Sequence, residues 1–197
     1  MIEVLTSLAV TGLFAVGGIL FVFLIALAFM YNSLISKRNA VENTFASVDV
    51  MLKKRHDLIP NLISTVKGYM KHERGVFEKI TELRASAIKP GVPVEEKLRC
   101  ENQLTGLLKS LFVSVENYPQ LKASENFMHL QKTMTELEEQ ISAARRAYNA
   151  QVLSYNNAVD MFPTNIIASL FRFLRKPFFE AESGEKTVPS VSEKLGK

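Results

Sequence analysis

The stretch from Val4 to Met30 carries no charged residue, and this feature constrains the fold more than any other. About 20 consecutive apolar residues are enough for a helix to cross the hydrocarbon core of a bilayer. We therefore expect residues 1–30 to form a transmembrane anchor, with the span at about 4–30. The alternative is a secretory signal peptide, because Ala-Leu-Ala at 26–28 resembles a cleavage site. However, the stretch is longer than the apolar core of a signal peptide, and no basic residue precedes it.

Basic residues follow this stretch but do not precede it, which predicts the orientation of the anchor. The N-terminal side offers only Glu3 and the terminal amine. The basic residues that follow are Lys37, Arg38, Lys53, Lys54 and Arg55. Because positive charge is retained on the cytoplasmic side of a membrane, the N-terminus should face outward, and everything from Tyr31 onward should be cytoplasmic.

Beyond Tyr31 the apolar residues recur with a seven-residue pattern that is typical of helices packed along a narrow seam. One set of seam positions reads Val41, Val48, Arg55, Leu62, Tyr69, Val76 and Leu83. The other set reads Phe45, Leu52, Ile59, Val66, Glu73, Ile80 and Ala87. Only Arg55 and Glu73 break the pattern. It predicts one helix from about 33 to 87, which the Lys-Pro-Gly-Val-Pro turn at 89–93 ends.

Two further helices are expected after this turn. The first covers about 94–117 and stops at Tyr118-Pro119, because a residue before proline disfavours helical geometry. The second begins after Ser124, a suitable N-cap, and reaches Pro163. Short connections favour antiparallel neighbours. The predicted fold class is all-α: an N-terminal transmembrane helix, then an elongated antiparallel bundle of three long helices with a short C-terminal helix, covering 31–180.

The sequence RHDLIPNL at 55–62 places charged residues and a proline inside the first of these helices. Pro60 lacks an amide hydrogen and crowds the carbonyl four residues back, so it should kink or divide the helix. Arg55 lies on the seam, and a charge that faces a core requires a partner, which implies a carboxylate on a neighbouring helix. His56 and Asp57 turn progressively away from the seam, so the three side chains should not converge as a catalytic triad.

Composition and motifs argue against several classes of function. The chain has 24 Lys and Arg against 20 Asp and Glu, interleaved along the sequence, so the dense basic face that nucleic-acid binding requires is not expected. One cysteine, Cys100, and three histidines are too few for a zinc site of Cys and His. HERGV at 72–76 begins like a zinc-protease motif but has Val76 where the second histidine is required. We find neither a glycine-rich phosphate loop nor a nucleophile elbow, and we expect no enzyme activity, metal, cofactor or small-molecule substrate.

Three tyrosine-asparagine pairs recur in the chain, Tyr31-Asn32, Tyr148-Asn149 and Tyr155-Asn156. The last two tyrosines stand seven residues apart on one helical stripe, where their rings should pack while their hydroxyls seek partners. Core packing is the simplest interpretation. Together with the residues discussed above, the candidate structural or interaction residues are Arg55, Asp57, Pro60, Asn61, Glu73, Tyr148, Asn149, Tyr155, Asn156 and Pro163.

The segment 164–179 combines apolar and basic residues. It has two interpretations: a short helix that caps the bundle, which we favour, or a basic amphipathic segment that lies on anionic lipid or in the groove of a partner. The residues of this candidate membrane or partner surface are Phe171, Arg172, Phe173, Arg175, Lys176, Phe178 and Phe179. The polar tail 181–197 has little to bury and should be disordered.

Five runs carry a family resemblance: RHDLIPNL at 55–62, KGYMKHE at 67–73, ENYPQLKA at 116–123, ARRAYNAQVLSYN at 144–156 and FPTNIIA at 162–168. In this order and spacing they resemble the LemA family of bacterial proteins, and the resemblance extends from about Tyr31 to Glu182. It implies a single N-terminal membrane helix, an elongated helical bundle and no established catalytic activity. Through some relatives it implies a link to membrane-bound zinc metalloproteases of the HtpX type, and through others a part in building magnetosome membranes.

Two functional hypotheses follow. In the first, the protein is a non-enzymatic scaffold or adaptor that crosses the bacterial inner membrane once. It self-assembles into a homo-oligomer and holds a protein partner, such as a membrane-bound zinc metalloprotease or another component of membrane quality control. In the second, it binds or shapes the bilayer through the basic amphipathic segment 164–179.

Overall fold

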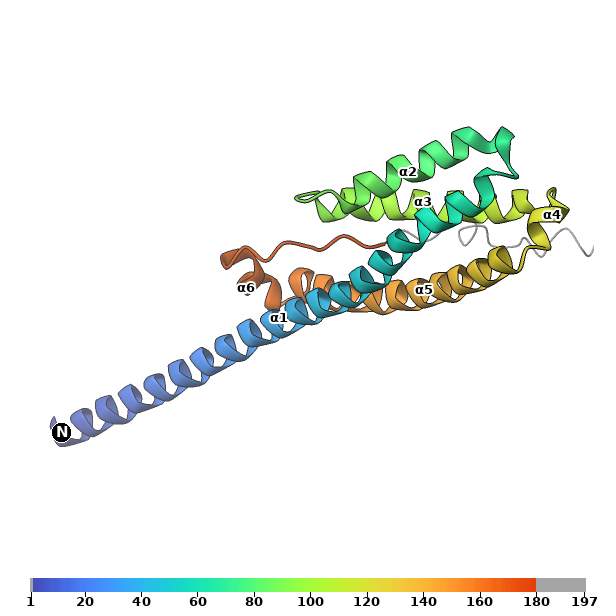
Figure 1. The fold of residues 1–197 in the computed structure, drawn as a ribbon. Helices are drawn as coiled ribbons and strands as arrows, with labels where there is room; N and C mark the ends of the chain where they lie inside the picture. The colour runs from blue at the N-terminus through green and yellow to red at the C-terminus, as the bar shows by residue number, and fades with distance from the viewer. Residues whose placement is uncertain (1, 180–197) are drawn as a thin grey trace, which may run out of the picture. The chain divides into compact units, whose positions relative to one another are not determined.

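The computed structural model describes residues 2–179, and every regular element in this part of the chain is helical (Figure 1). The elements are α1 (Ile2–Lys67), the 3-10 turn η1 (Lys71–Glu73), α2 (Arg74–Ile88), α3 (Val94–Val115), α4 (Pro119–Lys122), α5 (Glu125–Asp160) and α6 (Thr164–Leu170). The predicted all-α class is confirmed, including the short C-terminal helix. The tail 181–197, which the sequence predicts to be disordered, lies outside the described residues.

The chain divides into two compact units. Unit 1 takes the chain up to Thr44 together with Ala150–Lys176, and unit 2 takes Phe45–Asn149 together with the chain from Pro177. α1 and α5 contribute residues to both units. The predicted boundary between an anchor and a bundle after residue 30 rests on composition and stays a prediction.

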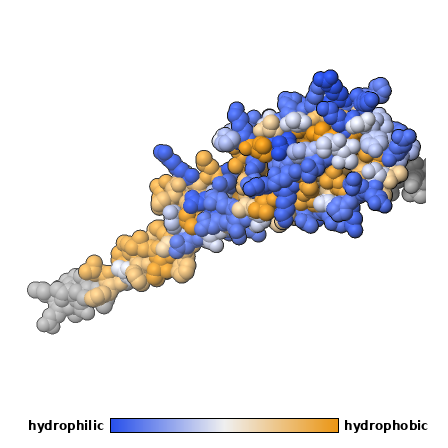
Figure 2. Space-filling view, in the orientation of Figure 1, coloured by the Kyte–Doolittle hydropathy of each residue, from blue (hydrophilic) through white to orange (hydrophobic). Residues whose placement is uncertain are grey.

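In unit 1 the side chains described between residues 12 and 29 of α1 are almost all exposed, and most of them are apolar. Within the described part of the chain, α1 is the one helix that is long and apolar enough to cross a membrane, and its most apolar window has no buried residue. Figure 2 shows this apolar surface along the N-terminal part of α1. Buried apolar residues of α1 begin at Leu34, which is fully buried, and continue with Val41. An uncovered apolar helix of this length is what a bilayer span presents.

Unit 2 contains an antiparallel bundle of four helices: residues 45–67 of α1, α2, α3 and residues 125–149 of α5. Each helix runs opposite to the one before it in the chain (Figure 1). The helices predicted at 94–117 and after Ser124 correspond to α3 and α5.

The helix predicted from 33 to 87 is two helices, so the prediction of one continuous helix is wrong. α1 ends at Lys67 and α2 begins at Arg74, so the bundle of unit 2 is built from four helices where the sequence predicts three long ones. Glu73, predicted on the seam, lies in η1 and is half-buried. The buried residues of α2 are Phe77, Ile80, Leu83 and Ala87.

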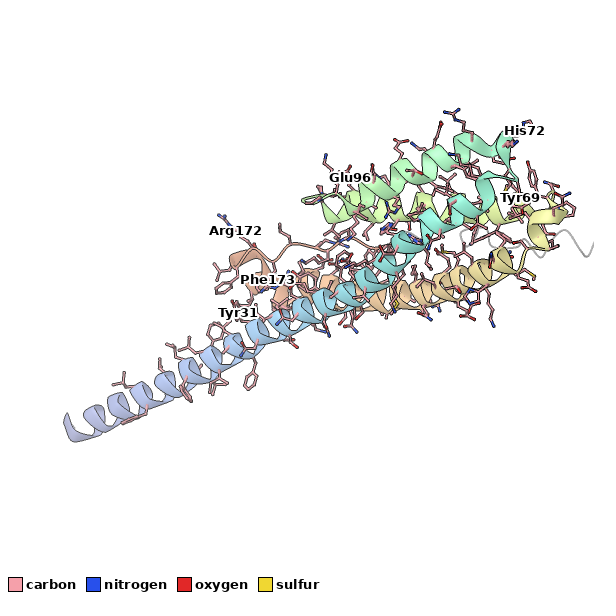
Figure 3. The ribbon with its side chains drawn as sticks, in the orientation of Figure 1. Tyr31, Tyr69, His72, Glu96, Arg172 and Phe173 are labelled. Atoms are coloured by element: carbon pink, nitrogen blue, oxygen red, sulfur yellow. The ribbon has the colours of Figure 1, made fainter. Side chains whose placement is uncertain are left out.

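The local sequence explains where α1 ends. Gly68 follows the last helical residue, and glycine loses more conformational freedom in a helix than any other residue. The amides of Tyr69 and Met70 both donate to the Val66 carbonyl at 3.0 Å, which closes the helix end. Met70 is fully buried, whereas Tyr69, predicted on the seam, is 47% exposed. Figure 3 shows Tyr69 and His72 at this turn.

Pro60 does not divide the helix, because α1 continues through it. A proline offers no amide hydrogen to the carbonyl four residues back, which here belongs to His56. That carbonyl accepts a hydrogen bond of 2.7 Å from Arg84 Nε of α2. A side chain of the neighbouring helix therefore replaces the missing main-chain donor.

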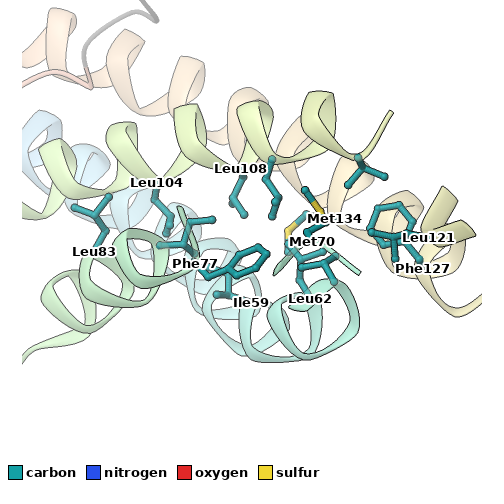
Figure 4. Packing of buried hydrophobic residues seen from close by; sticks show 14 residues of the cluster. Ile59, Leu62, Met70, Phe77, Leu83, Leu104, Leu108, Leu121, Phe127 and Met134 are labelled. Atoms are coloured by element: carbon teal, nitrogen blue, oxygen red, sulfur yellow. The ribbon is translucent and has the colours of Figure 1, made fainter. Parts of the chain in front are cut away.

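The hydrophobic core of unit 2 draws on all four helices of the bundle (Figure 4). Full burial of a large apolar side chain contributes about 1.5–3 kcal/mol relative to exposure, so this core is the main source of bundle stability. Its buried members include Ile59, Leu62 and Val66 of α1, Phe77 and Ile80 of α2, Leu104, Leu108 and Leu111 of α3, and Phe127 and Met134 of α5.

Candidate functional site

A cluster of charged and polar side chains lies inside unit 2 and joins α1, α3 and α5. Arg55 of α1 is fully buried, and its guanidinium donates to Thr105 Oγ1 of α3 at 2.7 Å and to Glu138 Oε1 of α5 at 2.8 Å. Arg55 also forms an ion pair with Glu101 of α3, which is fully buried as well. The sequence implies one carboxylate partner for Arg55, and α3 and α5 each supply one. Arg55, His56, Glu101, Thr105 and Glu138 are termed the buried polar cluster.

His56 belongs to this cluster, which corrects the expectation that it turns away from the seam. Its Nε2 lies 2.8 Å from Glu101 Oε1, and the residue is only 4% exposed. The reason is that α1 packs against more than one helix, so a wider arc of its surface is covered than a two-helix seam would cover. Asp57 follows on the exposed side of α1.

Glu101 decides the electrostatics of the cluster. Burial, the strongest influence, raises the pKa of its carboxyl, but the hydrogen bond from His56 and the positive charge of Arg55 lower it. The net pKa therefore lies below the ordinary value. Glu101 is ionised at neutral pH and compensates the charge of Arg55. Breaking a buried ion pair leaves an uncompensated charge. The cluster therefore fixes how α1, α3 and α5 are aligned along their axes.

A half-open cavity of about 450 Å³ lies in unit 2 between α3 and α5 and is termed the α3–α5 groove. Its apolar lining includes Leu108, Phe112 and Ile141, and its charged lining includes Lys109, Glu139 and Arg146. Thr105 and Glu138 also line it, so the groove adjoins the buried polar cluster. A cavity of this size with a mixed lining suits an apolar side chain of a partner flanked by polar groups.

In unit 2, the Tyr148-Asn149 pair of α5 binds the main chain of the C-terminal segment. Tyr148 Oη donates to the Pro177 carbonyl at 2.9 Å. The Asn149 amide accepts from the Phe179 amide at 2.9 Å and donates to the Phe179 carbonyl at 3.0 Å. Burial raises the pKa of Tyr148 to about 12, so its hydroxyl keeps the proton that it donates.

In unit 1, the Tyr155-Asn156 pair binds the main chain of residues 174–176 in the same way. Tyr155 Oη donates to the Leu174 carbonyl at 3.0 Å. The Asn156 amide accepts from the Lys176 amide and donates to the Lys176 carbonyl, each at 2.9 Å. Tyr155 and Asn156 are both buried, and burial raises the pKa of Tyr155. Core packing alone is therefore an incomplete interpretation of these pairs.

The two pairs bind successive parts of the same C-terminal segment. The pairs stand seven residues apart in α5, and their partners stand three residues apart in 174–179. The repeat in the sequence thus serves as two successive attachment points, termed the Tyr-Asn clamps.

The remaining predicted residues lie outside the cluster and the clamps. Asp57, Pro60 and Asn61 are exposed on α1, Glu73 lies in η1, and Pro163 is exposed just before α6.

The surface residues predicted within 164–179 divide into two groups. Phe173 and Phe179 are buried, and Lys176 is half-buried. The exposed members are Phe171, Arg172, Arg175 and Phe178.

The partners of Arg55 are the functional residues that sequence analysis missed. Glu101 stands seven residues before Leu108 on the apolar stripe of α3, so extending the seven-residue count to α3 would have found it. Glu138 follows Leu137 of the α5 stripe, and no periodic signal marks it. Among the side chains that the structure describes, no group of three or more His, Cys, Asp or Glu is placed to hold a metal ion.

A comparison with known families identifies the family of this chain. A model described as the LemA family matches residues 44–192. The chain belongs to the LemA family. The family resemblance of these sequence runs is thereby confirmed, and the matched residues include the buried polar cluster and both Tyr-Asn clamps.

The individual relatives have low sequence identity to this chain, but the similarity covers most of the length of both chains. Protein LemA of Metamycoplasma hominis is 25% identical over 162 residues, which cover 82% of this chain and 74% of the relative. Magnetosome protein MamQ 2 of Paramagnetospirillum magneticum is 21% identical over 198 residues, covering 88% of this chain and 72% of the relative. Magnetosome protein MamQ of Magnetospirillum gryphiswaldense is 19% identical over 201 residues, covering 88% and 74%.

Proposed function

We propose that this LemA-family protein is a non-enzymatic, membrane-anchored scaffold or adaptor. The observation that carries the proposal is that one helix, α1, supplies both the candidate membrane span and core residues of unit 2 such as Leu62. The connection is helical and contains no Gly- or Ser-rich linker. The charged cluster adds rigidity rather than reactivity, because Arg55 and Glu101 are fully buried. A firmly packed bundle attached to a membrane suits the display of a partner.

The proposal places the protein in the bacterial inner membrane with one span, the N-terminus outside and the bundle in the cytoplasm. Its support is the basic excess after the apolar stretch, which includes Lys37, Arg38, Lys53 and Lys54. A protease added to intact spheroplasts should leave everything beyond Tyr31 undigested, and should digest it after lysis. Digestion in unbroken spheroplasts would show that the orientation is the reverse.

The α3–α5 groove is the proposed contact surface for a protein partner. Its apolar residues, such as Phe112, lie beside charges of both signs, such as Lys109 and Glu139. Binding energy at interfaces concentrates in such partly enclosed apolar pockets with polar surroundings. The proposed partner is a membrane-bound zinc metalloprotease of the HtpX type, or another component of membrane quality control, held by a homo-oligomer of this protein.

Photo-crosslinking in native membranes tests this contact with two adjacent positions. A photoreactive amino acid replaces Phe112, which lines the groove, or Val113, which is 71% exposed and does not line it. The full-length protein with the probe at Phe112 should form one discrete crosslinked product, identified by mass spectrometry as the metalloprotease. The probe at Val113 should not form it.

Other outcomes separate the parts of the proposal. A discrete product of the Phe112 probe with a different membrane protein would support an adaptor but contradict the proposed protease. A product with a second copy of this chain would support self-assembly through the groove. If neither probe forms a product and the protein is monomeric in mild detergent, the scaffold proposal is wrong.

A further inference from the structure

The C-terminal part of unit 1 carries a group of uncovered apolar side chains. Six large apolar residues between positions 161 and 174 are each between 55% and 79% exposed. They are Met161, Phe162, Ile166, Leu170, Phe171 and Leu174, and together they are termed the α6 surface. Figure 2 shows apolar surface over the region of α6. Single exposed apolar residues are ordinary, but six of them within one short segment indicate an interaction surface.

The exposure is not the result of a loosely placed segment. The opposite side of the same segment is buried, because Ile167, Ala168 and Phe173 are at most 8% exposed. Arg38 of α1 lies over the Phe173 ring, 5.5 Å from its centroid. The Tyr155-Asn156 clamp fixes the main chain just beyond this point. The segment therefore packs on unit 1 with one side and presents the α6 surface with the other.

Contacts between aromatic rings show which part of α1 lies beside the α6 surface. The Tyr31 and Phe171 rings have centroids 4.8 Å apart, and the Tyr31 and Phe173 rings 5.9 Å apart. Tyr31 directly follows the uncharged stretch that ends at Met30. If that stretch crosses a bilayer, Tyr31 lies at the boundary between acyl chains and headgroups, where tyrosine is enriched. Phe171 must then lie at the same depth.

The charges around the α6 surface suit the same location. Arg172 is exposed and points away from the helices, whereas Phe173 lies near Tyr31 (Figure 3). Arg175 is 64% exposed while it pairs with Asp160 at 3.1 Å. An apolar face flanked by arginines is the composition of a segment that lies in a membrane interface, with its apolar side about 5–10 Å deep and its cations at the lipid phosphates.

We propose that the α6 surface is a lipid contact, which rests on the cytoplasmic leaflet of the same bilayer that α1 crosses. Its apolar side chains enter the boundary between headgroups and acyl chains, and Arg172 faces the lipid phosphates. The continuity of the surface with the end of the apolar stretch favours lipid over a soluble protein, which would have to enter the headgroup layer to cover Phe171. The inference rests on the proposed membrane anchoring of α1.

The depth of a spin label tests this contact in the full-length protein. Cys100, the single cysteine, is replaced by serine, and one new cysteine is introduced and labelled at Leu170, at Val113 or at Leu20. Leu170 and Val113 are both 71% exposed, so they differ in position but not in exposure. The proteins are reconstituted into vesicles of phosphatidylethanolamine and phosphatidylglycerol, and accessibility to oxygen and to a water-soluble nickel complex is measured.

The label at Leu170 should be several-fold more accessible to oxygen than to nickel, relative to the label at Val113. If Leu170 behaves like Val113 while Leu20 is shielded from nickel, the lipid contact is wrong and the anchoring stands. If Leu20 is also open to nickel, the anchoring itself fails. If the shielding of Leu170 vanishes when the ratio of protein to lipid is lowered, a second copy covers the surface, and the lipid contact is again wrong. A label at Leu174 provides an independent repeat of each result.

Discussion

Replacement of Arg55 by alanine should destabilise the bundle far more than replacement of an exposed arginine. Arg55→Ala removes the hydrogen bonds to Thr105, to Glu138 and to the main-chain carbonyl of Glu101, together with the ion pair to the Glu101 carboxylate. The larger effect is on what remains, because the fully buried Glu101 carboxylate loses Arg55 and is left with His56, whose Nε2 lies 2.8 Å from it. Loss of one partner of a buried ion pair costs about 3–5 kcal/mol.

The assay is thermal unfolding of the full-length protein in mild detergent, monitored by circular dichroism, and the quantity compared is the thermal midpoint. For a domain of this size, 1 kcal/mol shifts the midpoint by about 2–4 °C, so Arg55→Ala should lower it by about 6–20 °C. The matched control is Arg74→Ala. Arg74 pairs with Glu78 at 2.8 Å, but the two side chains are 84% and 64% exposed. An exposed pair of this kind contributes less than about 1 kcal/mol, which is less than about 4 °C.

A double substitution separates the lost attraction from the stranded charge. Arg55→Leu with Glu101→Leu removes both buried charges, and should cost less than Arg55→Ala alone because no carboxylate is left uncompensated on α3. If Arg55→Ala lowers the midpoint no more than Arg74→Ala does, Arg55 faces solvent and the seam before Pro60 is placed wrongly. The 55–62 run would then be the better candidate for a binding surface.

Three further predictions concern single contacts. The pKa of Glu101 is lower in the folded state than its ordinary value, so the ionised carboxylate stabilises the bundle fully above the ordinary pKa. This contribution is lost as the pH falls through the lowered pKa. Glu101→Gln should therefore make the thermal midpoint less dependent on pH on the acid side. Asn156→Ala should release the 174–176 segment and speed its cleavage by trypsin, whereas Asn157→Ala, at an exposed position, should leave the rate unchanged. Arg84→Leu should cost about 1–3 kcal/mol in a urea titration, because it leaves the His56 carbonyl, four residues before Pro60, without its donor. The cost should be clearly smaller when Pro60→Ala is also present, because that substitution supplies a main-chain amide to the same carbonyl. Equal costs would show that the side-chain donor is not needed.

The one wrong helix boundary shows what seven-residue counting is unable to detect. Ile80 and Leu83 are on the seam as predicted, and the misplaced positions are those in and next to the turn, such as Tyr69 and Glu73. The turn occupies residues 68–73, close to one seven-residue repeat, so the apolar pattern resumes in nearly the same phase after the chain reverses. Periodicity along a sequence does not distinguish a long helix from two helices joined by such a turn.

The charged residues differ in how far the sequence predicts their contacts. Arg55 interrupts an apolar seam, and burial of a charge demands a partner, so its pairing follows from local pattern and electrostatics. Arg84 donates a hydrogen bond to the carbonyl of His56, 28 residues earlier. This contact depends on the chain reversal between α1 and α2, which the seven-residue pattern does not reveal. The Tyr-Asn clamps likewise depend on the path of an extended segment that has no periodic signal of its own.

The buried ion pair explains how a bundle of repeating apolar positions acquires one register. A shift of α1 by seven residues would bring Val48 or Leu62 to the level of Glu101, and would move Arg55 to an apolar level of α3. Exchange of one apolar residue for another of similar size costs less than about 1.5 kcal/mol. Separating Arg55 from its carboxylates costs about 3–5 kcal/mol, because both sides of the pair would be buried without a partner. A single charged position on the seam therefore discriminates between alignments that apolar packing alone leaves nearly equal.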